Sequence, residues 1–139
     1  MQSAEEGPIV MVKLSDGEDV LASLEAAAHT HKLENGAVLW GIGMLKDFEI
    51  GFFGSEGYER KTIPNPHELI ALHGSIAMNA DPRFHLHVAV GQRDHSVVGG
   101  HLFRAKACVV NEICLERFGR IRLRRLPNPK TGLSELDVG

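Results

Sequence analysis

Apolar and polar residues alternate along most of this chain with a period of two, which is typical of half-buried β-strands. The alternation is clearest in two stretches that flank a polar turn around Asp94. In the first stretch, His85 and His87 lie two residues apart and therefore point to the same face of a sheet. The second stretch opens with Gly99-Gly100-His101. The pattern predicts a hairpin over residues 83–116 in which position 87 lies opposite position 101.

This register gathers the imidazoles of His85, His87 and His101 on one face of two neighbouring strands. Cross-strand neighbours on one face stand roughly 5 Å apart at Cβ. Three ring nitrogens can then reach one metal ion at about 2.0–2.1 Å each. The opposite face is apolar and is expected to pack into a core through Leu86, Val88, Val90 and Leu102.

The rest of the chain predicts one helix and further strands. Apolar residues recur every three to four positions over 18–32, which predicts a helix. Ser15 or Asp16 is its expected N-cap, and His29 and His31 are expected to be solvated at its end. Period-two or β-rich segments predict strands at 9–14, 37–46, 47–53, 58–63, 67–78 and 119–126.

The predicted fold class is α+β: a strongly bent, mostly antiparallel sheet of seven or eight strands with one main helix packed against it. A length of 139 residues suits one domain over 1–139, with 1–8 expected to be frayed and 127–139 to form a tail. The tail is expected to dock on the body or on a neighbouring subunit. No run approaches the roughly 20 apolar residues of a membrane span, and the polar, acidic start does not resemble a signal peptide. We therefore expect a cytoplasmic protein with no membrane partner.

Charge weighs against nucleic acid as the main ligand. The net charge is −3, whereas nucleic-acid binders usually carry a basic patch. The aromatic residues are not interleaved with Lys and Arg, so they are expected in the core or at an interface rather than in a base-stacking platform. The basic cluster near the C-terminus divides between two faces if it lies on a strand; it consists of Arg117, Arg120, Arg122, Arg124 and Arg125.

The two cysteines, Cys108 and Cys114, lie six residues apart in an extended segment. Fully extended, that separation is on the order of 20 Å, which is beyond the reach of a disulfide. They are expected to be reduced core residues.

Two runs resemble the prokaryotic branch of the plants-and-prokaryotes conserved (PPC) domain family: HELIALHGSIAMNADPRFHLH and HLHVAVGQRDHSVVGGHLFRAKACVVNEICLE. That family pairs an H-x-H strand with a G-G-H-L strand and a T-x-E-like segment, here Asn111-Glu112. The stretch HELIALHGS is similar to G-R-F-E-I-L-x-L-x-G-S of plant AT-hook proteins, although Asn65-Pro66-His67 stands where the family often has Gly-Arg-Phe. The resemblance covers about residues 9–137.

The resemblance implies a compact α+β domain that assembles as a homotrimer, and bacterial members commonly carry a DNA-binding label. The Arg-Gly-Arg-Pro core of an AT-hook does not occur in this sequence. The fold is also distantly similar to acetolactate decarboxylase, which holds zinc with an H-x-H strand and a third His on the next strand. His85, His87 and His101 match that pattern.

Imidazole-only ligation suits Zn most simply, with Cu, Ni or Fe as other divalent candidates. Three protein ligands leave a fourth position for water or substrate, and bound water there ionises near neutral pH. If the chain is an enzyme, a zinc-dependent lyase or hydrolase acting on a small molecule is the expected type, and it needs a general acid or base. The candidates are Glu112, which matches the family's Glu position, His73 and Glu49. The alternative for Glu112 is a carboxylate that is ion-paired at the surface or at a trimer interface. The alternative for His73 is a histidine that is hydrogen-bonded within the sheet.

Three functions therefore compete. The first is a homotrimeric metal-binding domain that acts on, or senses, a small-molecule ligand. The second is a DNA-binding or transcription-associated regulatory module without metal chemistry, which the family label and the arginine cluster favour. The third is an assembly module that recruits a partner through its sheet edge or tail.

Overall fold

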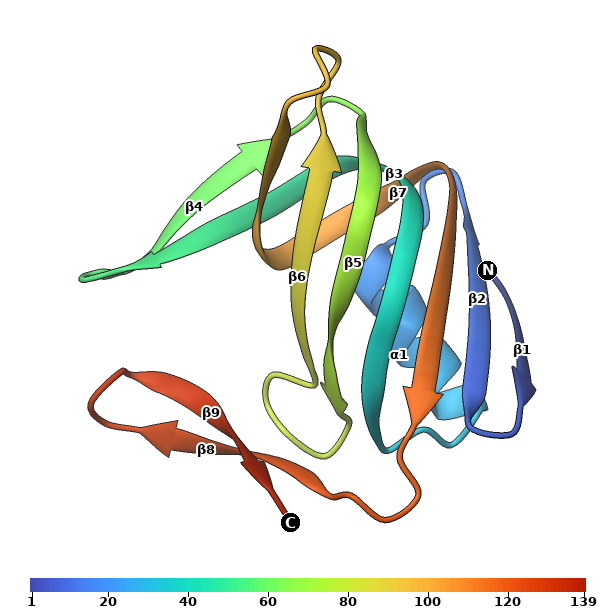
Figure 1. The fold of residues 1–139 in the computed structure, drawn as a ribbon, viewed down its shortest axis with the longest axis vertical. Coiled ribbons are helices and arrows are strands. Elements are labelled where there is room, and N and C mark those ends of the chain that lie inside the picture. Colours follow the sequence, from blue (N-terminus) through green and yellow to red (C-terminus); the bar gives the residue numbers. More distant parts are fainter.

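Nine strands and one helix make up the computed structural model, which describes residues 1–139 (Figure 1). Seven strands form one sheet in the order β1-β2-β7-β6-β5-β3-β4, and β8 and β9 form a separate hairpin. Every strand pair is antiparallel, which confirms the predicted α+β class. The elements are β1 (Gln2–Glu6), β2 (Ile9–Ser15), α1 (Val20–Thr30), β3 (Asn35–Gly54), β4 (Gly57–Ile63), β5 (His67–Ala77), β6 (Phe84–Gly91), β7 (Val97–Arg117), β8 (Leu123–Asn128) and β9 (Leu133–Val138).

Two long strands bend the sheet on itself. β3 and β7 span 20 and 21 residues, and they pair with each other as well as with β5 and β6 respectively. The β3–β7 ladder contains four register shifts, which allow the strands to curve. The two predicted strands at 37–46 and 47–53 are in fact one strand. At the predicted break the strand has a β-bulge, where Asp47 has a φ of 46°.

The helix begins later than the sequence pattern predicts. Its N-cap is Asp19, whose carboxylate accepts a hydrogen bond from the Ala22 amide at 2.9 Å. The prediction of Ser15 or Asp16 is wrong, because Ser15 still belongs to β2 and Asp16 is bound by Lys46 and by the Val109 amide.

Both termini are more ordered than expected. Residues 1–8 were predicted to fray, but β1 pairs along its whole length with β2. The ring of His31 is not solvated, since its Nε2 lies 2.9 Å from the hydroxyl of Ser3. His29 is exposed, as predicted. Residues 127–139 are not a simple tail, because β9 pairs with β8.

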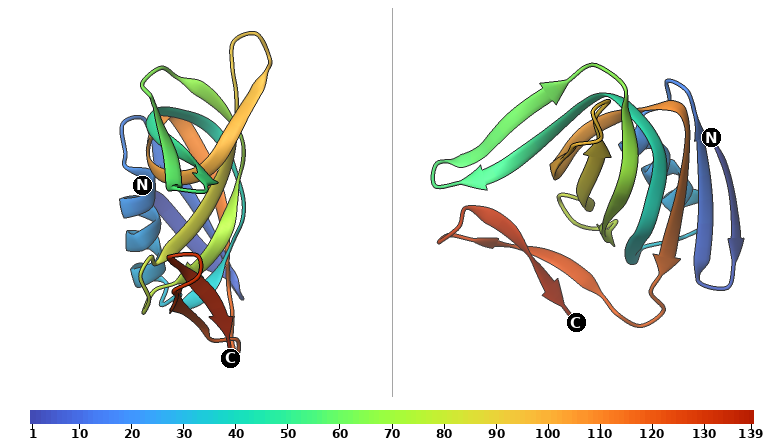
Figure 2. Two further views of the ribbon diagram at one scale, coloured as in Figure 1. Left: turned by 90° about the vertical axis from the view of Figure 1, so that its left-hand side faces the viewer. Right: turned by 45° about the horizontal axis from the view of Figure 1, so that its top comes forward.

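The core lies between α1 and the inner face of the sheet, and the helix stands on one side of the strands in the rotated view (Figure 2). Leu86, Val88, Val90 and Leu102 are at most 4% exposed, which confirms the predicted apolar face of the hairpin. Cys108 and Cys114 are free and buried, as expected. The only helix is too short to cross a membrane.

Two hairpins extend from this body: the ends of β3 and β4, and the C-terminal pair β8–β9 (Figures 1 and 2). The C-terminal hairpin is attached at its base, where the Leu123 amide donates a 2.8 Å hydrogen bond to the buried side chain of Asn35. This attachment places β8 near the outer face of β5.

Close approach of β5 and β6 depends on Gly74. A Cβ added at this residue would lie 1.9 Å from the backbone oxygen of His85. We expect Gly74→Ala to lower the free energy of unfolding by about 2–3 kcal/mol, because the strands must separate beside His85. Gly119→Ala is the matched control, since a Cβ there meets no atom within 4 Å, and we expect it to change stability by no more than about 0.5 kcal/mol. Urea unfolding measures both, and equal stability of the two variants would contradict the packing argument.

Candidate metal centre

The strand register brings the hairpin histidines together as predicted. His87 on β6 lies opposite His101 on β7, and His73 on β5 lies opposite His87 from the other side. His85 is two residues from His87 on the same face and lies opposite Ser75. Three imidazoles and two further polar residues therefore share one outer patch of the sheet.

One nitrogen from each of His85, His87 and His101 lies within 4.8 Å of the other two. The Nε2 atoms of His85 and His87 are 3.2 Å apart. Two nitrogens that bind the same tetrahedral zinc at about 2.05 Å are about 3.3 Å apart. The observed separation thus suits two ligands of one ion.

The three imidazoles are electrically suited to be ligands, because they resist protonation. Burial and the neighbouring histidines lower the pKa of His101 from its ordinary 6.5 to about 4. Burial also lowers the pKa of His85 and of His87. In addition, Nδ1 of His101 is buried without a hydrogen-bond partner. Neutral rings with free lone pairs, one of them an unpaired buried nitrogen, fit a metal ion better than a hydrogen-bonded sheet surface.

Aromatic rings form one wall beside His101. Tyr58 and Phe103 have ring centroids 4.9 Å and 4.6 Å from that of His101. Gly51 lies opposite His101, and a Cβ at Gly51 would come within 2.6 Å of the Phe103 ring. Sequence reasoning missed Tyr58, because its position depends on how the β3–β4 hairpin bends.

The predicted acid–base candidates are not gathered with the three histidines in one chain. Glu112 is exposed on β7 and pairs in register with Lys13 and Ile42, away from the histidine end of that strand. Glu49 is bound by Arg60 and Arg104.

For Glu49, burial raises the pKa, but hydrogen bonds from Arg104 and Arg60 outweigh it and lower the pKa overall. Its carboxylate is therefore a poor proton acceptor. His73 is exposed and stands beside His87, outside the group of three.

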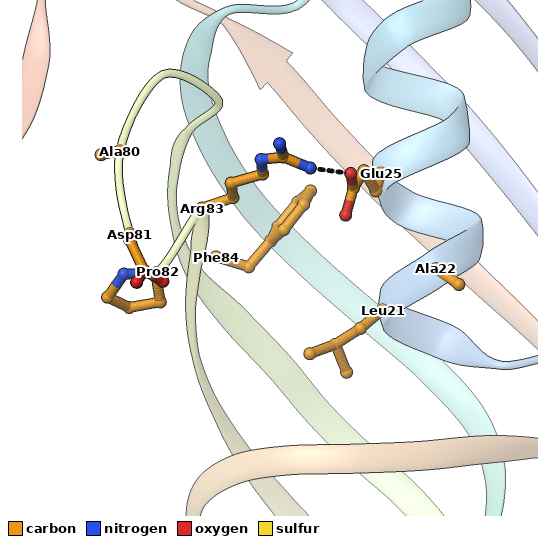
Figure 3. Close-up of a pocket in the computed structure, with 8 residues that line it drawn as sticks. All are labelled: Leu21, Ala22, Glu25, Ala80, Asp81, Pro82, Arg83 and Phe84. Carbon is orange, nitrogen blue, oxygen red and sulfur yellow. Dashed lines mark hydrogen bonds and ion pairs between the residues drawn. The ribbon is translucent and has the colours of Figure 1, made fainter.

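A cleft of about 340 Å³ opens beside the histidines. Its walls come from His85 and His101, from the Tyr58 and Phe103 rings, and from Arg125 and the β8–β9 turn. A second cleft of about 510 Å³ lies between α1 and residues 80–84, where Arg83 forms an ion pair with Glu25 (Figure 3). It contains none of the three histidines, so the first cleft is the one beside the candidate metal centre.

Solved structures share this fold. A plant- and prokaryote-conserved (PPC) protein of Pyrococcus horikoshii superposes with a TM-score of 0.82 at 28% identity, covering 94% of this chain and 92% of that one. A protein of Bacteroides thetaiotaomicron described as a "putative DNA binding protein" has a TM-score of 0.87 at 27% identity, covering 98% and 96%. A metal-containing protein of Archaeoglobus fulgidus has a TM-score of 0.80 at 27% identity, covering 94% of each chain.

Sequence comparison adds a relative of different length. The bifunctional protein GlmU of Synechococcus sp. (strain JA-3-3Ab) is 30% identical over 130 residues, which are 91% of this chain but only 20% of that protein. The chain thus spans about a fifth of the length of this curated relative. The model of the Plants and Prokaryotes Conserved (PCC) domain matches residues 1–119. Together with the shared fold, this match shows that the chain belongs to the Plants and Prokaryotes Conserved domain family.

Proposed function

We propose that this chain binds a divalent transition metal, most simply Zn²⁺, through His85, His87 and His101, and offers it to a small-molecule ligand. The observation that carries the proposal is the convergence of three ring nitrogens within 4.8 Å on one face of a rigid sheet. The relative from Archaeoglobus fulgidus, described as metal-containing, supports it.

The arrangement is an open site. Three protein ligands leave a fourth position, and an ion bound there supplies Lewis-acid chemistry or lowers the pKa of bound water. The chain's own contribution is to hold the rings neutral and to exclude water on the side of Tyr58 and Phe103. No carboxylate joins the group, so Glu112 as a catalytic residue and a lyase or hydrolase activity stay predictions.

We also propose that the chain forms a homotrimer. The support in the structure is a set of large apolar side chains exposed on the sheet, of which Trp40 is 42% exposed. Met11 and Trp40 both lie opposite Cys114, and Ile42 lies two residues beyond Trp40, so these three share one face. Large apolar side chains that are exposed together on one face are typical of an interface. The number three comes from the family resemblance.

DNA binding has less support from the residues. Arg117 is bound to Glu5 and to backbone oxygens, Arg124 is paired with Asp137, and Arg125 points into the cleft. The C-terminal arginines therefore do not form one free basic face, and the net charge is −3. What favours this alternative is the description of relatives as DNA-binding.

Replacing one of the three histidines should remove the metal. We expect purified wild type to retain about one transition-metal ion per chain and His87→Ala to retain far less, because two imidazoles alone bind weakly. His73→Ala is the matched control, since His73 lies directly opposite His87 but outside the group. Inductively coupled plasma mass spectrometry measures the content. Equal metal content in wild type and His87→Ala would contradict the proposal.

Acid should destabilise the metal-free protein. Below about pH 6.5 the unfolded chain takes up protons on these imidazoles, whereas the folded protein keeps His101 neutral down to about pH 4. The unfolded state then binds more protons, so the free energy of unfolding falls as the pH falls from about 6.5 to about 4. In the presence of EDTA, urea titrations at several pH values should show a shallower fall for His101→Gln than for wild type. Identical slopes would be evidence against the pKa assignment.

A charge on the apolar face should disrupt assembly. Sedimentation equilibrium of wild type is expected to give three times the chain mass of 15.2 kDa. Trp40→Glu is expected to shift it towards the monomer, because burying a carboxylate at an apolar interface is costly. Lys61→Glu is the control, since Lys61 lies on the exposed edge strand β4. A monomeric wild type would refute the trimer.

A further inference from the structure

Arg125 has no carboxylate partner, unlike the other arginines whose side chains contact distant parts of the chain. Arg60, Arg83, Arg104, Arg117 and Arg124 each pair with a carboxylate. Arg125 has no such partner, although it is only partly exposed. Its guanidinium donates one good hydrogen bond, at 2.9 Å, to the neutral hydroxyl of Ser75, and a long one of 3.4 Å to the backbone oxygen of Pro82. None of its N–H donors meets an anion.

The cleft that Arg125 faces also lacks an anion. None of its twelve lining residues is Asp or Glu, and Arg125 is its one Lys or Arg residue. Burial lowers the pKa of Arg125, but an arginine remains protonated throughout the range in which proteins fold. A half-buried cation without a counter-charge is costly, so the cleft is complementary to a negatively charged group.

Strand register places this cation next to the metal centre. Ser75, which holds the guanidinium, is the direct cross-strand partner of His85. Cross-strand partners stand roughly 5 Å apart at Cβ. One small molecule in the cleft therefore meets the guanidinium on one side and the histidine group on the other.

We propose that Arg125 is the anion-recognition residue of this cleft, and that the ligand is a small molecule bearing a carboxylate or phosphate oxyanion. This inference rests on the proposed metal centre for the second contact of the ligand. The planar fork of a guanidinium binds such oxyanions through two parallel hydrogen bonds. A volume of about 340 Å³ is near the lower end of the range for small-molecule sites, roughly 300–1,000 Å³.

The test compares wild type with Arg125→Gln, Arg125→Lys and the control Arg124→Gln. Arg124 is the preceding residue on β8, pairs with Asp137 and does not line the cleft. Thermal unfolding is followed with increasing acetate, inorganic phosphate or the neutral acetamide, for zinc-loaded and for EDTA-treated protein. A ligand that binds only the folded state stabilises it by RT ln(1 + [L]/Kd), so at a given concentration a tighter ligand raises Tm more. Acetamide controls for the effect of a neutral co-solvent of the same shape, and Arg124→Gln controls for general salt effects.

We expect acetate or phosphate, but not acetamide, to stabilise wild type and Arg124→Gln. Arg125→Gln should bind the anion about tenfold more weakly or worse, because a charged hydrogen-bond pair is lost. The anion affinity of Arg125→Lys should lie between those of wild type and Arg125→Gln, because a lysine keeps the positive charge but lacks the planar guanidinium fork. Comparing the rise in Tm with acetate and with phosphate shows whether the cleft prefers a carboxylate or a phosphate.

Equal anion-dependent stabilisation of wild type and Arg125→Gln would overturn the assignment, as would equal effects of acetate and acetamide on wild type. Metal content of the same samples separates this inference from the metal proposal. Full zinc content with no Arg125-dependent anion effect refutes the inference alone. An Arg125-dependent anion effect in protein that retains no zinc after zinc loading supports the inference and refutes the metal centre.

Discussion

The antiparallel register of β5, β6 and β7 is the constraint on which the candidate site depends. Because side chains alternate between faces with a period of two, a one-residue slip would turn every histidine of a strand to the other side of the sheet. The register is held by the core, where Leu86, Val88 and Leu102 are buried on the opposite face. Packing on the inner face thus determines which imidazoles meet on the outer one.

The histidine group could be predicted because it follows from local rules. A short turn around Asp94 sets the pairing of β6 with β7, and alternation then determines which side chains share a face. The wrong expectations all involve longer-range packing. The pattern at residues 1–8 is too polar to indicate a strand, and β1 forms because the edge of β2 is available. The N-cap is Asp19 and not Ser15 or Asp16, because β2 continues to Ser15 and the helix can begin only after it.

Residues that surround the histidines could not be predicted for the same reason. Tyr58 and Arg125 reach the cleft from the β3–β4 and β8–β9 hairpins, whose directions are set by bulges and by the Asn35–Leu123 hydrogen bond. Glu112 follows His101 on the same strand, but the unbroken length of β7 carries it away from the cleft. The candidate site therefore combines three histidines of the sheet with residues from two projecting hairpins.

Anomalous X-ray diffraction at the zinc absorption edge, from crystals of the zinc-loaded protein, tests directly whether the three histidines hold one ion. We expect one strong peak per chain, about 2.0–2.1 Å from a ring nitrogen of each of His85, His87 and His101. Rings that point away from one another with no peak between them, or a peak bound by other residues, would contradict this expectation.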